Sequence, residues 1–180
     1  LRGGCCNELA WAITRVLTEI EDDQFQTRFN QLIQQLRSQV AEQIDNPFGV
    51  AFPWQIWGVT WQLQTMGVKL YYLHKTYPVL FEAELLYRIV HYVLGAHPGS
   101  STSLVSGVGV RSMTTAFGTN RADFSYIPGG GGSGPNLIRP DFPELKEGYP
   151  HIWQQAEYVM GGASTYLFCV LATDNLLTHE

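Results

Sequence analysis

The carboxylate of Glu157 stands at the head of an uncharged stretch of the chain. From Tyr158 to Ala172 there is no Lys, Arg, Asp or Glu. An ionised group beside so apolar a run is costly unless it has partners or a chemical task, and desolvation raises the pKa of a carboxyl group. A carboxyl group with a raised pKa can act as a general acid near neutral pH. The alternative is a structural carboxylate that the dipole of a helix N-terminus favours.

A second carboxylate is needed if Glu157 is to take part in the acid–base hydrolysis of a glycosidic bond. The segment before it, rich in glycine and proline, offers Asp123, Asp141, Glu144 and Glu147. Asp123 lies in the sequence NRADFSY, so it can either contact a substrate or pair with Arg121 to hold the segment in place. For Glu144 and Glu147 we favour solvated loop charges.

Aromatic side chains that can stack on sugar rings stand near these carboxylates in the sequence. Trp153 precedes Glu157 by four residues, which places both on one face if the segment is helical. Tyr126 follows Asp123 by three residues in the same loop. These positions favour Trp153 and Tyr126 as substrate-binding aromatics, with an ordinary core role as the alternative.

Other kinds of site have little support in the residues. The histidines show no metal-ligand spacing, and the glycine run 129–132 lacks the Lys-Ser/Thr pair of a phosphate-binding loop. The serines between positions 100 and 106 lie in no nucleophile motif, and Cys169 has the setting of a small buried hydrophobic residue. We therefore expect no metal ion and no cofactor.

The composition predicts one apolar domain without a nucleic-acid partner. The chain has 180 residues, of which 45% are hydrophobic and only 15% charged; this length suffices for a single substantial core. A net charge of −5 without a Lys/Arg cluster argues against nucleic-acid binding. No segment is suited to membrane insertion, and Leu1 begins no signal peptide but leads into a helical pattern, as if inside a fold.

Hydrophobic spacing predicts an all-α fold of about five long helices, at residues 7–20, 25–44, 54–77, 78–95 and 152–177. The second is amphipathic, with one apolar stripe, and a turn and capping site at Glu21-Asp22-Asp23 precedes it. The third would contain Gly58 and Gly67, Pro78 would open the fourth, and Gly95 would end it. Residues 96–152 form a long irregular loop, which in a compact domain is usually functional. More polar and nearly apolar helices alternate, as in an α/α toroid, and five helices would form only part of a closed ring.

The order of several motifs resembles that of glycoside hydrolase family 9. Residues 92–95 read YVLG and Pro98 follows, while residues 103–109 read SLVSGVG, similar to a helix end and a glycine turn of the family. The sequence NELAWAITRVL at residues 7–17 resembles another family helix. The final helix, with small residues after Glu157, resembles the helix that carries the catalytic acid.

The resemblance implies that residues 1–180 are the C-terminal portion of one (α/α)6-barrel domain that hydrolyses β-linked glucans or related oligosaccharides with inversion. Glu157 would be the general acid. Arg121 would remain from the family's His-His-Arg sugar-binding cluster. His97, which stands where the family has Asn before Pro98, would also bind the substrate. No motif for the paired aspartates of the base occurs here, so the N-terminal part of the same domain would be a partner. Secretion or a periplasmic location would follow.

Three interpretations remain open from the sequence. The stretches NRADFSYIPGG and RPDFPELKEGYPHIWQQAEY are similar to a bacterial subgroup and favour oligosaccharide trimming over cellulose. A non-catalytic helical toroid that binds carbohydrate or serves as a scaffold would use Glu157 only as a ligand contact or a helix cap. A lyase would need a base such as Tyr126 or His151.

Overall fold

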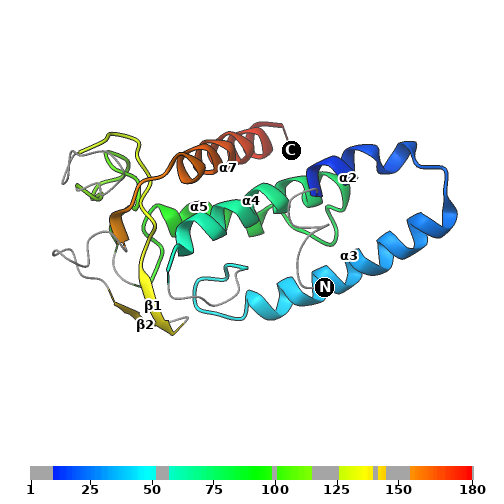
Figure 1. Cartoon of the computed structure of the whole chain (residues 1–180), viewed down its shortest axis with the longest axis horizontal. Coiled ribbons are helices and arrows are strands. Elements are labelled where there is room, and N and C mark those ends of the chain that lie inside the picture. The colour runs from blue at the N-terminus through cyan, green and yellow to red at the C-terminus, as the bar shows by residue number, and fades with distance from the viewer. Residues whose placement is uncertain are drawn as a thin grey trace.

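The computed structural model describes residues 10–51, 57–98, 101–114, 126–139, 142–144 and 155–179, and most of these residues are helical. The helices are α2 (Ala10–Val16), continued by the 3-10 turn η1 (Leu17–Glu19), α3 (Asp23–Gln43), α4 (Val59–Thr76), α5 (Glu84–Val93) and α7 (Met160–His179). Figure 1 shows α4 and α5 along the middle of the molecule, α7 above them in this view, and irregular segments at one end. The predicted all-α class is therefore confirmed.

A short hairpin lies in the segment for which no regular structure was predicted. Strands β1 (Asn136–Arg139) and β2 (Phe142–Glu144) pair antiparallel, and the register is irregular between Leu137 and Arg139. Runs of three and four residues are too short for a periodic hydrophobic signal to emerge from the sequence. Figure 1 places this hairpin at the same end of the molecule as the start of α7.

Helix α3 begins and ends where local sequence chemistry predicts. The Asp22 side chain caps it by accepting hydrogen bonds from the backbone N–H groups of Gln24 and Phe25, at 2.9 and 3.0 Å. The predicted apolar stripe is buried at Phe29, Ile33 and Val40. After the C-cap at Ile44 the chain turns, and α3 therefore agrees with the predicted amphipathic helix.

Helix α4 begins at Val59, so the prediction of a helix from Trp54 with Gly58 inside it was wrong. Gly58 is the N-cap residue and has a left-handed backbone with φ of 71°, a conformation that costs a residue with a side chain more than it costs glycine. Gly67 lies inside α4 as predicted, and it permits a close approach to α7. A Cβ at Gly67 would lie 2.7 Å from the Sγ of Cys169.

Helix α5 begins at Glu84, and the prediction that Pro78 opens it was wrong. The residues after Tyr77 form a turn. The carbonyl oxygen of Tyr77 accepts hydrogen bonds from the N–H groups of Leu80 and Phe81 in this turn. The predicted stop at Gly95 is confirmed. Gly95 has a φ of 127°, its N–H donates to the carbonyl of Tyr92, and the next N–H reaches the carbonyl of His91, which is the Schellman pattern.

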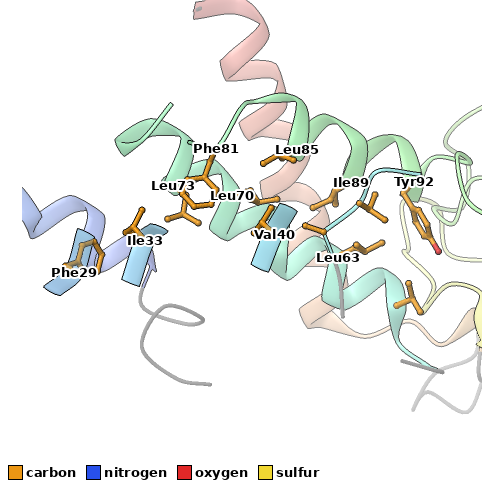
Figure 2. Packing of buried hydrophobic residues seen from close by; sticks show 13 residues of the cluster. Phe29, Ile33, Val40, Leu63, Leu70, Leu73, Phe81, Leu85, Ile89 and Tyr92 are labelled. Carbon is orange, nitrogen blue, oxygen red and sulfur yellow. The ribbon is translucent and has the colours of Figure 1, made fainter. Parts of the chain in front are cut away.

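Two clusters of buried side chains form the core around α4. The larger one joins α3, α4 and α5, and Figure 2 shows Ile33 beside Leu73 and Val40 beside Leu70 within it. The second cluster joins α4, α5 and α7 through Leu86, Val90, Cys169, Ala172 and Leu176. Helix α4 therefore lies between the amphipathic α3 on one side and α7 on the other.

Helix α7 begins at Met160, eight residues later than predicted, and only one of its faces is enclosed. Cys169, Ala172 and Leu176 face α4 and α5, whereas Leu167 and Leu171 are each 60% exposed. No other described element covers this second face of α7. Among the described residues, no helix has the length and apolar character that crossing a bilayer would need.

Candidate active site

Glu157 lies between two helical segments and outside α7. Gln155 and Ala156 have helical backbone, residues 157–159 do not, and α7 starts at Met160. The predicted placement of Glu157 on that helix was therefore wrong. Its side chain is partly exposed, and burial raises the pKa of its carboxyl group above the ordinary value. The predicted direction of the pKa shift is confirmed, and a partly exposed, readily protonated carboxyl group can donate a proton to a ligand.

The neighbouring Tyr158 anchors this segment to two distant parts of the chain. Its hydroxyl is hydrogen-bonded to the Oγ of Ser106, and that Oγ in turn donates to the carbonyl of Met113 at 2.7 Å. Its ring lies where a side chain at position 130 would be, so Gly130 is required for this contact. The pKa of Tyr158 is raised, mainly because burial desolvates its hydroxyl group. The hydrogen bond to Ser106 lowers this pKa, and the electrostatic effect of Tyr126 raises it further.

Backbone hydrogen bonds connect the loops around Tyr158 to each other. The N–H of Ser106 donates to the carbonyl of Gly130 at 2.9 Å, and the N–H of Gly129 returns a bond to the carbonyl of Ser106 at 2.7 Å. The N–H of Gly132 donates to the carbonyl of Leu104 at 2.8 Å. The glycine run is thus a hydrogen-bonded part of the site, whereas the sequence indicated only loop glycine.

The same loops are fastened to the helices that form the core. The N–H of Leu104 donates to the carbonyl of Val93, the last residue of α5, at 2.8 Å. The N–H of Thr60, in the first turn of α4, donates to the carbonyl of Ser133 at 3.1 Å. The two helices α4 and α5 therefore hold the loops that surround Tyr158.

Tyr126 is the predicted substrate-binding aromatic that the structure brings to this region. It is 52% exposed, and its hydroxyl lies over Gly107, where a Cβ would be only 2.8 Å away. Its influence on the pKa of Tyr158 places the two phenols near each other. An exposed ring beside a hydroxyl group can contact both the C–H face and the hydroxyls of a sugar.

His97, also predicted as a substrate-binding residue, lies in the interior just after α5. It is 6% exposed, its Nε2 is 2.8 Å from the carbonyl oxygen of Thr102, and its ring centroid is 5.6 Å from that of Tyr92. Burial lowers the pKa of His97, and the bond to Thr102 opposes this shift. A neutral imidazole that donates to this carbonyl holds the turn after α5, which makes His97 a support for the loop.

Arg121, Asp123 and Trp153 lie outside the described residues, so their predicted roles in substrate binding stay predictions. The sequence alone did not point to Ser106 or Tyr158 as parts of the site. Ser106 was considered only as a nucleophile, and Tyr158 only as the start of an apolar run. Ser106 lies in the SLVSGVG turn, and Tyr158 directly follows Glu157. These positions hint at a role in the site, but no local pattern predicts that two residues 52 positions apart are in contact.

Comparisons with known proteins assign the chain to no family. No protein-family model matches the sequence, and no curated protein is significantly similar to it. Within the part of the chain that the structure describes, no group of three or more His, Cys, Asp and Glu side chains could hold a metal ion.

Proposed function

We propose that this chain is the C-terminal portion of an inverting glycoside hydrolase in which Glu157 is the general acid. The observation that carries the proposal is the partly exposed carboxyl group of Glu157, whose pKa burial raises, next to a loop framework that holds its backbone. The order of the family-like motifs supports the same reading, with the helices forming part of an (α/α)6 barrel. The residues around Glu157 supply position and partial desolvation, which are the two requirements of an acid catalyst.

In this mechanism Glu157 protonates the leaving oxygen of a β-glycosidic bond. An aspartate from the N-terminal part of the same domain activates a water on the opposite face of the sugar. The two carboxyl groups of an inverting enzyme stand about 6.5–9.5 Å apart, which leaves room for that water. Protonated Glu157 is neutral, so it donates its proton as negative charge develops on the leaving oxygen.

The substrate is an oligosaccharide with β-linked sugars. Tyr126 offers an exposed aromatic face, and Trp153 would add a second one. Arg121 and Asp123 would contact sugar hydroxyls, because a guanidinium donates and a carboxylate accepts hydrogen bonds. His97 would act indirectly by holding the loop, since it is buried and bonded to Thr102.

The partner in this proposal is the N-terminal part of the same domain, and the outer face of α7 is where it would pack. Leu167 and Leu171 are 60% exposed and Leu177 is 68% exposed, and no charge occurs between Tyr158 and Ala172. A face without charges can pack against an apolar helix, whereas a charged partner would find no ion-pair partner on it. Burying the exposed parts of Leu167 and Leu171 would contribute about 2–4 kcal/mol.

The test of the proposal is Glu157→Gln in the complete enzyme. Glutamine keeps the size of the side chain but cannot donate a proton as an acid, so turnover of an unactivated oligosaccharide should fall about 10²–10⁴-fold. Turnover of an aryl glycoside with a good leaving group should fall much less, because that oxygen needs little protonation. The product anomer, read by NMR immediately after cleavage, should show inversion.

The matched control is Glu82→Gln, which changes an exposed glutamate in the turn before α5. It should leave both activities unchanged, and both variants should unfold at about the wild-type temperature. Near-normal hydrolysis of the oligosaccharide by Glu157→Gln would refute the role of Glu157 as acid. Retained oligosaccharide binding without any hydrolysis by the wild type would instead favour the non-catalytic carbohydrate-binding protein.

A further inference from the structure

We propose that Tyr158 is a positioning residue that holds Glu157 in place through its hydrogen bond to Ser106. This inference rests on the proposed function for its consequence in catalysis, and on the contacts of Tyr158 for its geometry. Tyr158 is not expected to touch the substrate. It acts on the neighbouring carboxylate through the backbone they share.

The backbone around Glu157 lacks the support that a helix would give it. Residues 157–159 lie between helical residues and the first residue of α7. The bonds that flank them are the N–H of Gly134 donating to the carbonyl of Gln155 at 3.1 Å, and the N–H of Ala163 donating to the carbonyl of Val159 at 3.1 Å. Glu157 itself forms an isolated β-bridge, so side-chain contacts of this short connection act together with backbone pairing to fix the direction of its side chain.

Tyr158 makes such contacts with two loops at once. The Oγ of Ser106 has a single hydrogen, which it donates to the carbonyl of Met113. The Tyr158 hydroxyl is therefore the donor in its bond to Ser106. Its ring packs against the backbone of Gly130, where no side chain would fit. One side chain thus joins the connection before α7 to the two loops on either side of it.

The loops on the other side of this contact are themselves fixed to the core. Ser106 and Gly130 are bonded through their backbones, and Leu104 is bonded to Val93 at the end of α5. Leu104 and Val105 are buried together with Val93. The hydroxyl of Tyr158 therefore links Glu157 to a rigid part of the molecule, so that the carboxyl group keeps its partly buried position.

The test removes only this hydroxyl, by Tyr158→Phe, and measures the chain without any substrate. Losing one net hydrogen bond should make the backbone amides of residues 157–159 exchange with solvent about fivefold faster. The pKa of Glu157, followed through its ¹³C-labelled carboxyl group by NMR, should fall toward its ordinary value, because a freer side chain is better hydrated. Among the described residues of the adjoining segments, Tyr158 and Tyr126 carry the phenols that face this connection, and burial raises the pKa of Tyr158 further above its ordinary value.

Tyr166→Phe is the matched control. Tyr166 lies on α7 against the cluster of Val93, Leu104 and Val105, and its hydroxyl makes no hydrogen bond to another described residue. This variant should leave both readouts unchanged. Ser106→Ala removes the same bond from the other side and should reproduce both effects, which keeps the test valid if Tyr158→Phe folds poorly. Unchanged exchange and an unchanged pKa in a folded Tyr158→Phe or Ser106→Ala chain would overturn the inference.

These measurements separate the two proposals. If Glu157→Gln keeps full hydrolytic activity, Glu157 is not the acid, yet a shifted Glu157 pKa in Tyr158→Phe would still establish the positioning contact. If both hold, Tyr158→Phe in the complete enzyme should lower kcat several-fold on an unactivated oligosaccharide and leave KM unchanged. A change confined to KM would contradict a role exerted through Glu157.

Discussion

Replacing Gly67 by alanine tests how closely α4 and α7 approach each other. A Cβ at this position would lie 2.7 Å from the Sγ of Cys169 and 3.2 Å from the Cδ1 of Leu86. Both neighbours are buried in the cluster between α4, α5 and α7, so they have little room to move. Forcing an extra methyl group into a packed core costs about 1–3 kcal/mol.

Helix propensity acts in the opposite direction. Alanine in place of an interior helical glycine gains up to about 1 kcal/mol. The two effects leave Gly67→Ala about 1 kcal/mol less stable than the wild type. Gly161→Ala is the matched control, because Gly161 lies in α7 and a Cβ there meets no atom within 4 Å. This control should gain up to about 1 kcal/mol, so the two variants should differ by about 2 kcal/mol.

Urea unfolding, followed by the helical circular dichroism signal, measures both variants. Repeating Gly67→Ala in a Cys169→Ala background isolates the contact, because that background lacks the Sγ that the new methyl group would meet. The loss caused by Gly67→Ala should then vanish, which corresponds to a coupling of about 1 kcal/mol. A Gly67→Ala chain as stable as Gly161→Ala would refute the close approach of the two helices.

Two further predictions concern the helix cap and the pH dependence of stability. Asp22→Ala should cost about 1 kcal/mol in urea unfolding, since it removes the acceptor of two backbone N–H groups, whereas Asp23→Ala, which removes no cap, should cost clearly less. The raised pKa of Glu157 stabilises the folded chain below the ordinary value of 4.5, and this contribution is lost as the pH rises through the higher folded value. Wild-type stability relative to Glu157→Gln should therefore fall over that pH range, and a constant difference would show that the carboxyl group is not desolvated.

Local sequence signals predicted the amphipathic helix α3 and the end of α5 well. For α3, a 3.6-residue apolar period and the Asp22 cap agree, and both act within a few residues. At the end of α5, Gly95 adopts a positive φ, which costs glycine little because it has no side chain. Such features need no information from the rest of the chain.

The starts of α4, α5 and α7 were predicted too early for a common physical reason. Apolar residues continue outside each helix, because turns that pack against a core also bury apolar side chains. Phe81 is an example, since it is fully buried in the turn before α5. A pattern of apolar residues indicates which side chains are buried. It indicates the bounds of a helix only where the buried segment and the helix have the same ends.

The sequence by itself determined that the chain is mainly helical, that it carries little charge, and that Glu157 stands alone beside an apolar run. These properties follow from residue types and short spacings. The tertiary structure decided that Glu157 precedes α7, that Tyr158 reaches Ser106 across 52 residues, and that one apolar face of α7 stays exposed. Contacts of that kind depend on how loops close and helices pack, because each is formed by residues that no local period connects.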